Sequence, residues 1–232
     1  KTIAFIGFGL INSSLARVVK TKGLAEKIHA YSRSEATRAK IKKLNIVDNI
    51  YDNSVEAVKG ADLVILGIPV GATRDTVSTF ASSLSPGTII TDVGSVKKSV
   101  IDGLSSVLPE NINFVPAHPI AGTEKSGPEA GFETLFEGHW CVITPTKNTD
   151  KEAIKKVTKI WESAGMQVAE MDAKYHDLVL AITSHIPHLV AYSIVGTVAE
   201  LEDHLKTEVI KYAAGGFRDF TRIAGSDPVM WR

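Results

Sequence analysis

Residues 3–12 read IAFIGFGLIN, and this stretch predicts the fold of the first part of the chain. Four apolar residues typical of a buried strand run into Gly7-Phe8-Gly9, after which the chain takes on helical spacing. In such a strand–turn–helix unit, the first glycine permits the tight turn, and the second lets a pyrophosphate approach the amides at the helix start. The stretch therefore indicates a dinucleotide-binding turn. Two glycines alone are a weak signal, because ordinary turns into helices also contain them.

Asn12 stands where such turns usually have a third glycine. That glycine mainly gives the helix room to pack on the strand, so its replacement should cost packing room rather than the phosphate contact. The side-chain amide of Asn12 is itself a candidate donor to the cofactor. Leu10 at the helix start and Pro69 just beyond a later strand are further candidate cofactor contacts.

Beyond this turn, short apolar runs alternate with segments of helical period, which is the pattern of β-α units around a parallel sheet. The predicted strands are residues 3–6, 28–31, 63–67, 88–92, 113–117, 140–144 and 167–170. The predicted helices are residues 10–20, 35–44, 54–59, 73–84, 96–107 and 151–164.

After about Asp172 the strand signals stop, and apolar residues recur at helical spacing from Tyr175 to Leu205, with an interruption at Pro187. We therefore predict an α/β fold with two domains. A Rossmann-type dinucleotide-binding domain over residues 1–172 is followed by an all-α helical domain over residues 173–232.

Composition favours a small-molecule partner. The 232 residues include 26 basic and 26 acidic side chains, and the net charge of +0 argues against a nucleic-acid groove or an anionic membrane surface. No apolar run approaches the length needed to span a bilayer, and because the sequence opens directly on the first predicted strand we expect no export. The single cysteine, Cys141, excludes an internal disulfide and fits a reducing compartment. We expect a cytoplasmic protein with no membrane or nucleic-acid partner and no metal.

The end of the second predicted strand bears on the choice of cofactor. An NAD-specific site usually has an acidic side chain there, whereas a 2′-phosphate would be repelled by a carboxylate and held by arginine and hydroxyl donors. Ser32, Arg33 and Ser34 supply the second set, so we expect them to bind the cofactor, with NADP preferred over NAD and dual use open. Alternatively, Ser34 only caps the next helix beside an exposed Arg33.

Two side chains suited to chemistry follow later strands, at the sheet edge where ligands bind in this fold. Ser95 follows the strand over residues 88–92 and is placed to meet both cofactor and substrate; as a helix N-cap it would have a structural role, and the two roles are compatible. His118 follows the next strand, and imidazole has the right pKa range to accept a proton from an alcohol. A lone histidine is more often structural, but one beside a cofactor turn is not a typical core residue.

Four stretches, spread in order over nearly the whole chain, carry a family resemblance. They are Gly94-Ser95-Val96-Lys97, His118-Pro119-Ile120-Ala121-Gly122-Thr123-Glu124, Ser184-His185-Ile186-Pro187-His188 and Gly216-Phe217-Arg218-Asp219-Phe220-Thr221-Arg222. Together they resemble the prephenate/arogenate (cyclohexadienyl) dehydrogenase family of tyrosine biosynthesis. The resemblance implies that the first domain binds the nicotinamide cofactor and that the helical domain completes the substrate pocket and forms a homodimer.

The resemblance also implies roles for individual residues. His118 would be the catalytic base, oriented by Ser95, and Arg222 would bind the ring carboxylate. His188 would lie near the substrate's side chain, and His185 would be structural. Thr123 and Glu124 would border the same end of the pocket.

Two of these assignments have alternatives. Arg222 could form an ion pair with Asp219 or Asp227 instead of binding the ring carboxylate. Glu124 could pair with the ammonium of arogenate, or with Lys125 or Arg218.

The implied reaction is oxidative decarboxylation of prephenate and/or L-arogenate to 4-hydroxyphenylpyruvate and/or tyrosine. Hydride passes to NAD(P)+ while His118 takes the hydroxyl proton, and carbon dioxide leaves with its electrons delivered into the ring. Tyrosine could inhibit at the active site. Members of the family usually continue with further helices beyond the point where this sequence stops.

Two other functions remain open. The chain would also fit a β-hydroxyacid dehydrogenase, but Lys174, Lys206 and Lys211 lie in no comparable catalytic motif. A non-catalytic dinucleotide sensor is a further alternative.

Overall fold

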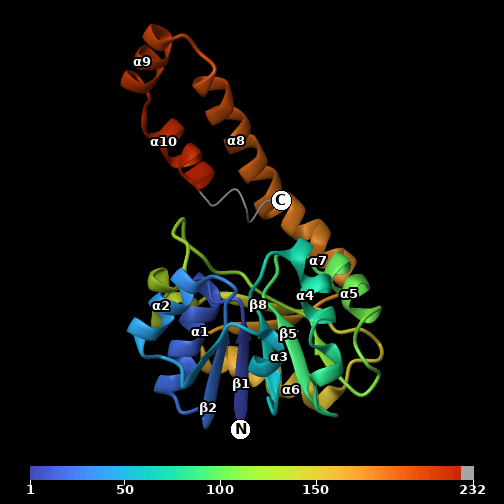
Figure 1. The fold of residues 1–232 in the computed structure, drawn as a ribbon. Helices are drawn as coiled ribbons and strands as arrows, with labels where there is room; N and C mark the ends of the chain where they lie inside the picture. Colours follow the sequence, from blue (N-terminus) through green and yellow to red (C-terminus); the bar gives the residue numbers. More distant parts are fainter. Residues whose placement is uncertain (226–232) are drawn as a thin grey trace. The chain divides into compact units, whose positions relative to one another are not determined.

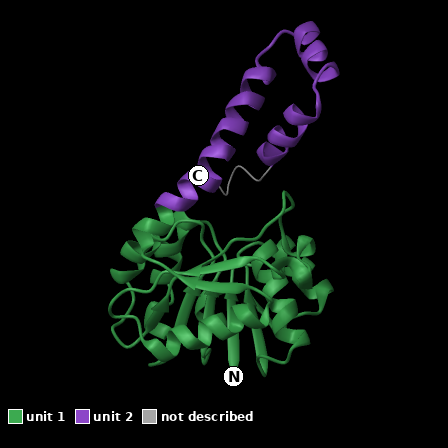
Figure 2. Ribbon diagram, turned by 180° about the vertical axis from the view of Figure 1, so that it is seen from behind, with its two compact units in different colours: residues 1–177 green, residues 178–232 purple. Residues whose placement is uncertain are grey.

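The computed structural model describes residues 1–225 of the chain and divides it into two units, residues 1–177 and 178–232 (Figure 2). Among the residues singled out above, Asp227 lies outside the described part. The first unit contains both sheets, and the second is helical (Figure 1).

The main sheet of the first unit has six strands, and every neighbouring pair is parallel. Its strands are β1 (Thr2–Ile6), β2 (Lys27–Tyr31), β3 (Asn49–Tyr51), β4 (Leu63–Leu66), β5 (Ile89–Asp92) and β6 (Asn113–Val115). They lie in the order β3-β2-β1-β4-β5-β6, which is the doubly wound order of dinucleotide-binding folds. The order reverses between β1 and β4, so ligands are expected beyond the carboxyl ends of these two strands.

Helices cover both faces of this sheet (Figure 1). The helices are α1 (Leu10–Thr21), α2 (Glu35–Leu44), α3 (Ser54–Val58), α4 (Thr73–Ser78), α5 (Lys98–Ser105) and α6 (Lys151–Ser163). Because side chains alternate along a strand, Ile3 and Phe5 belong to the core cluster with α1, α2 and α6, whereas Ala4 and Ile6 belong to the cluster with α3, α4 and α5. Burial on both faces explains why β1 is a continuous apolar run.

The first unit also contains a second sheet, of three strands. It consists of β7 (Ala117–Pro119), β8 (Trp140–Ile143) and β9 (Gln167–Glu170), with β7 antiparallel and β9 parallel to β8. The sequence predicted a single strand over residues 113–117, but the structure splits that segment at Pro116. Proline has no N–H to continue a ladder, so β6 ends there, and β7 joins the other sheet. His118 is therefore the middle residue of β7 rather than a loop residue after a parallel strand.

Two predicted helices differ from the structure in length, and one of them ends in a 3₁₀ turn. The helix predicted over residues 73–84 is α4 followed by the 3₁₀ turn η2 (Ala81–Ser83). The other 3₁₀ turns are η1 (Val70–Ala72), η3 (Pro128–Ala130) and η4 (Glu133–Phe136). The helix predicted over residues 96–107 corresponds to α5, which is shorter at both ends, Lys98–Ser105.

The helical region begins with α7 (Ala173–Leu180), which continues through the π-helical segment η5 (Ala181–His185) into α8 (Ile186–Ala199). Pro187 was expected to interrupt the helix, but the chain stays helical, because the wider π turn just before it accommodates a residue without an N–H. The stretch Ala173–Ala199 has 27 residues with a mean hydropathy of 1.6 in its most apolar window. The expectation that no apolar run is long enough to span a bilayer is therefore wrong by length and composition.

The second unit also contains α9 (Asp203–Lys211), α10 (Gly215–Thr221) and the 3₁₀ turn η6 (Arg222–Gly225).

Candidate active site

The turn between β1 and α1 has the shape that a dinucleotide needs. Gly7 adopts φ +80°, and a Cβ placed there would lie 2.4 Å from the Gly67 carbonyl oxygen, so a larger residue would both strain the backbone and collide. Gly9 caps α1, and a Cβ placed on it would meet nothing within 4 Å. The space beside Gly9 is thus open next to the first turn of α1, which begins at Leu10 and whose amides have no partner within the helix, so a pyrophosphate can approach there. These residues fit the pyrophosphate of a dinucleotide.

Asn12 serves the turn itself. Its side chain is 1% exposed, and its Nδ2 donates to the Gly7 carbonyl at 2.7 Å and to the Ile65 carbonyl at 3.4 Å. In this structure the side-chain amide therefore holds the turn, and its expected contact with the cofactor stays a prediction. The room that Asn12 needs is provided by Gly67, where an added Cβ would lie 2.3 Å from Asn12 Nδ2. The glycine absent from α1 is thus compensated by one that follows β4.

Replacing Gly67 with Ala should therefore weaken dinucleotide binding. The new methyl group would push Asn12 off the Gly7 carbonyl, and overpacking of this kind costs about 1–3 kcal/mol of unfolding free energy. We expect a lower melting temperature and a raised Kd for dinucleotide by calorimetry, both largely restored in the double variant Gly67→Ala/Asn12→Gly. Gly103→Ala, whose Cβ would make ordinary contact at 3.5 Å, is the control. A double variant no better than Gly67→Ala would contradict this account.

The end of β2 carries the residues expected to contact the cofactor ribose. Ser32 is buried at 8% exposure, whereas Arg33 and Ser34 are exposed. Ser34 Oγ accepts from the amide of Thr37 at 3.3 Å, so it caps α2, and its expected contact with the cofactor stays a prediction. Arg38 was not among the residues predicted from the sequence, but its Nη1 donates to the carbonyls of Ser32 and Arg33 at 2.8 and 3.0 Å and so shapes this loop.

Pro69 lies at the same sheet edge, just after β4. Its carbonyl accepts from the amide of Ala72 at 2.9 Å and from the Thr73 hydroxyl at 3.3 Å.

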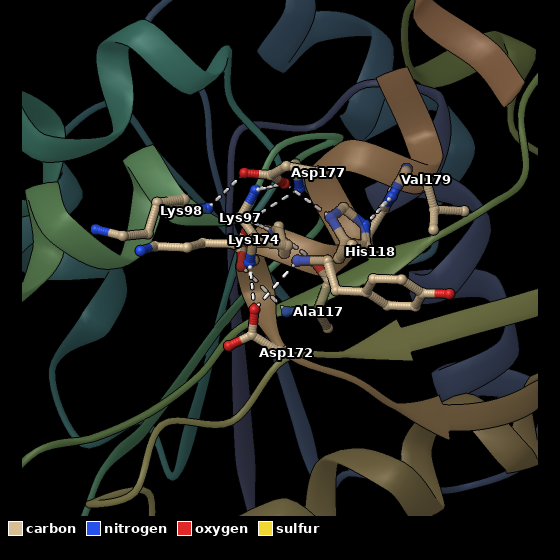
Figure 3. Close-up of polar contacts among 12 residues, drawn as sticks. Lys97, Lys98, Ala117, His118, Asp172, Lys174, Asp177 and Val179 are labelled. Carbon is tan, nitrogen blue, oxygen red and sulfur yellow. Dashed lines mark hydrogen bonds and ion pairs between the residues drawn. The ribbon is translucent and has the colours of Figure 1, made fainter. Parts of the chain in front are cut away.

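A buried ion pair joins the end of β5 to β7. Lys97 is 0% exposed, and its Nζ bonds to Asp92 Oδ2 and donates to the Ala117 carbonyl at 2.7 Å. Asp92 Oδ1 accepts from the amide of Ala117 at 3.2 Å. Burial lowers the pKa of the Lys97 amine, and the charge and hydrogen bond of Asp92 oppose that shift. Both polar groups of Ala117 are thereby fixed, which places the neighbouring His118 (Figure 3).

His118 is the first member of a buried chain of hydrogen bonds, part of which is drawn in Figure 3. It is 9% exposed, and its Nδ1 lies 2.9 Å from Nε2 of His176, which is 0% exposed on α7. His176 Nδ1 in turn lies 2.8 Å from Asp177 Oδ1. His118 was predicted from the sequence as a site residue, but His176 and Asp177 were not. We name the three side chains the His118–His176–Asp177 relay.

Asp177 also caps α5. Its Oδ1 accepts from the amide of Lys97 at 2.7 Å and its Oδ2 from the amide of Lys98 at 2.9 Å. Ser95 was the predicted cap, but it lies half-buried in the preceding loop, and the cap is a carboxylate from another part of the chain. Asp172 fixes the start of α7 by accepting from the amides of Lys174 and Tyr175 at 2.9 and 3.1 Å.

Comparison with known proteins identifies the family. Residues 15–170 match the prephenate dehydrogenase nucleotide-binding domain, and residues 172–232 match the prephenate dehydrogenase dimerization domain. The chain belongs to the prephenate dehydrogenase family. Its expected fold is confirmed, and so, at the level of this family, is the expected reaction, a dinucleotide-linked oxidative decarboxylation in tyrosine biosynthesis. The two alternative functions, a β-hydroxyacid dehydrogenase and a non-catalytic dinucleotide sensor, are therefore not pursued.

Individual relatives agree with the prephenate dehydrogenase assignment. The chain is 44% identical over 232 residues to a cyclohexadienyl dehydrogenase of Zymomonas mobilis and 38% identical to a prephenate dehydrogenase of Bacillus subtilis. It covers 79% and 62% of those proteins, respectively, with 100% of its own length. A crystal structure of Aquifex aeolicus prephenate dehydrogenase with hydroxyphenyl propionate and NAD+ is similar to all of the chain and 80% of that protein, with a TM-score of 0.91 and 36% identity.

The other residues expected in the prephenate dehydrogenase site lie in two places. Thr123 and Glu124 are exposed in the loop after β7, in the first unit. His188 and Arg222 belong to the second unit, as does His185, the last residue of the π segment. Their expected contacts with the substrate remain predictions.

His188 and Arg222 differ in their surroundings. Half-buried His188 uses Nδ1 to contact the Ser184 carbonyl at 2.9 Å, which orients its ring. Arg222 is exposed at the end of α10. Within residues 1–225 it forms no ion pair with Asp219, and Asp227, the other partner considered, lies outside that range.

Proposed function

We propose that this protein converts prephenate to 4-hydroxyphenylpyruvate, uses arogenate as a second substrate, and does so with His118 as the base. The observation that carries the assignment of the base is the geometry of His118. It is buried, next to a backbone fixed by the Asp92–Lys97 pair and hydrogen-bonded to a second histidine that contacts a carboxylate. An imidazole held in this way is positioned to accept a proton from an alcohol.

A bound nicotinamide supplies the acceptor for the hydride that leaves the ring carbon bearing the hydroxyl. The chain's own residues do the rest. His118 removes the hydroxyl proton as the carbonyl forms, and Arg222 holds the ring carboxylate until it departs as carbon dioxide, leaving its bonding electrons in the ring. Ser95 orients the histidine and the hydroxyl. The dinucleotide turn at Gly7 and Gly9 fixes the position of the cofactor.

Initial rates with prephenate and arogenate, each with NAD and with NADP, test this function. We expect reduced dinucleotide with prephenate and a lower rate with arogenate, for which exposed Glu124 is the candidate partner of the ammonium. The absence of reduced dinucleotide in all four mixtures, from folded protein that binds dinucleotide, would overturn the proposal.

The preference for NADP is proposed from the end of β2. The loop there carries Arg33 and two serines but no carboxylate over residues 31–34, and Arg38 holds it in place. A 2′-phosphate would gain a charge-assisted hydrogen bond from Arg33. Arg33→Ala should lower kcat/KM for NADP by about tenfold while changing that for NAD less than twofold, roughly as expected for an exposed charged contact. Equal losses with both dinucleotides would contradict the assignment. Lys27→Ala, at the other end of β2, is the control.

Arg222→Ala should raise the KM for prephenate by about 10- to 100-fold, with a smaller effect on kcat, because a guanidinium–carboxylate bond contributes about 1.5–3 kcal/mol. Steady-state kinetics at saturating dinucleotide measure this effect. Arg218→Ala, one helical turn earlier on α10, is the matched control. An unchanged KM in the Arg222 variant would favour the ion-pair alternative.

We propose that the helical unit forms a homodimer, in line with its match to a dimerization domain. Large apolar side chains on α7, η5 and α8 are exposed in the single chain; they are Tyr175, Leu178, Ile182, Ile186, Leu189, Val190 and Val195. A second copy of the chain would remove this surface from water. This burial would account for the high hydropathy of the helix without a membrane, consistent with the proposed cytoplasmic location.

Competition by tyrosine at the substrate pocket is proposed from the family resemblance.

A further inference from the structure

His176 and Asp177 are buried next to the proposed base, yet the reaction described above gives them no role. We propose that they are positioning residues: they fix the ring proton of His118 on Nδ1, and they stabilise the charge that His118 gains when it accepts the substrate's hydroxyl proton. This inference rests on the proposed function and deepens it. It depends on three contacts: His118 Nδ1 to His176 Nε2 at 2.9 Å, His176 Nδ1 to Asp177 Oδ1 at 2.8 Å, and Asp177 to the start of α5.

The hydrogen-bond partners determine the direction of each bond. Asp177 accepts two backbone N–H groups, one on each oxygen, as an ionised carboxylate does. Burial raises the pKa of Asp177, but the bonds from the Lys97 and Lys98 amides and from His176 outweigh it, and the net pKa is lowered. Because a carboxylate only accepts, His176 carries its proton on Nδ1.

A neutral His176 then has its lone pair on Nε2. Burial lowers its pKa, and the bond and charge of Asp177 oppose that shift only in part. In the contact between the two rings, His118 Nδ1 is therefore the donor and His176 Nε2 the acceptor. The basic nitrogen of His118 in this tautomer is Nε2, and that atom receives the substrate's proton.

The relay also responds to charge on His118. Once Nε2 is protonated, the Nδ1–H of the imidazolium bonds more strongly to His176, whose ring is polarised by the carboxylate of Asp177. The amino terminus of α5 holds that carboxylate through two amides and favours its negative charge. In a site with His176 at 0% exposure, such interactions are screened less than in water.

Other titratable groups near the relay are already accounted for. Asp92 from β5 and Lys97 from the loop before α5 pair with each other. Cys141 on β8 stays a neutral thiol, because burial raises its pKa. Asp177 is thus the carboxylate that reaches His118 through a hydrogen-bonded ring.

Nitrogen-15 NMR of the histidine side chains in the full chain, without cofactor or substrate, tests the tautomer directly. The signals of His118 and His176 are assigned from their loss in His118→Asn and His176→Gln. We expect both rings to be neutral near pH 7.5 with the proton on Nδ1. A His118 ring protonated on Nε2 instead would overturn the proposal whether or not the protein turns over prephenate.

Kinetics test the effect of the relay on the reaction. His176→Leu should lower kcat by about 10²-fold, the low end for loss of an acid–base function, without a change in the Kd for dinucleotide. The acid limb of its kcat/KM profile should move to lower pH, because the imidazolium of His118 is less stabilised. His176→Gln keeps an oxygen that can accept from His118 Nδ1, so it should recover at least tenfold in kcat relative to His176→Leu.

His29→Leu is the matched control, because His29 is another buried histidine, 8% exposed, whose Nδ1 contacts the Ala57 carbonyl at 3.1 Å. It should lower stability and leave the pH profile unchanged. A His176→Leu variant with the kcat and pH profile of His29→Leu would overturn the relay. If the wild-type chain makes no reduced dinucleotide at all, the proposed function fails, and the NMR result still decides the tautomer.

Discussion

His118→Asn should lower kcat for prephenate by about 10²–10⁴-fold, the range for loss of a general base. The amide of asparagine occupies the position of Nδ1, so it can still donate to His176, but nothing replaces Nε2 as proton acceptor. The Kd for dinucleotide should change less than twofold, because the dinucleotide turn is built from β1, α1 and Gly67. Initial rates and a binding titration measure the two quantities on one preparation.

The matched control for that result is His29→Asn, which changes a buried histidine on β2 that contacts α3. It should keep kcat within about threefold of wild type, as expected for a residue that has no part in the proposed chemistry. A His118→Asn variant with near-normal turnover would remove His118 from the role of base, whatever the outcome for the control.

Lys97→Met should lower the free energy of unfolding by about 3–5 kcal/mol, because it leaves the buried carboxylate of Asp92 without its cation. The Ala117 carbonyl loses its donor in the same variant, so the strand carrying His118 should be less well placed and kcat should fall as well. Urea denaturation followed by circular dichroism measures the first effect. The double variant Asp92→Asn/Lys97→Met should recover part of the lost stability, since it removes both charges.

Lys98→Met provides the control from the next position in the chain. Lys98 pairs with Asp102 on α5, and the two side chains are 44% and 59% exposed, so removing its charge should cost less than about 1 kcal/mol. Equal losses of unfolding free energy in the Lys97 and Lys98 variants would contradict the claim that the buried Asp92–Lys97 pair matters more to stability than the exposed Lys98–Asp102 pair.

Local pattern predicted much of the first unit. The turn at Gly7 was recognised because a buried strand precedes it and a helix follows it. The predicted bounds of α2, residues 35–44, agree with the structure, because Ser34 supplies a local cap and Asn45 a left-handed end. By contrast, β3 was missed because three residues, Asn49–Tyr51, are too few to show a period.

The remaining features depend on contacts between distant parts of the chain. The compensation of Asn12 by Gly67 joins residues from α1 and the end of β4. Asp177 caps α5 through Lys97 and Lys98, which precede it by 80 and 79 positions, and His176 meets His118 across 58 positions. The Asp172 cap could indicate from the sequence where α7 begins. No local signal shows that His176 on this helix contacts His118 on β7.

The most direct test of the central claim is the stoichiometry of one reaction. Purified protein is mixed with limiting prephenate and excess dinucleotide, and reduced dinucleotide and carbon dioxide are both measured. The proposed chemistry predicts one of each per prephenate consumed, with 4-hydroxyphenylpyruvate as the product. No reduced dinucleotide from folded protein that binds the cofactor, or reduced dinucleotide without carbon dioxide, would contradict it.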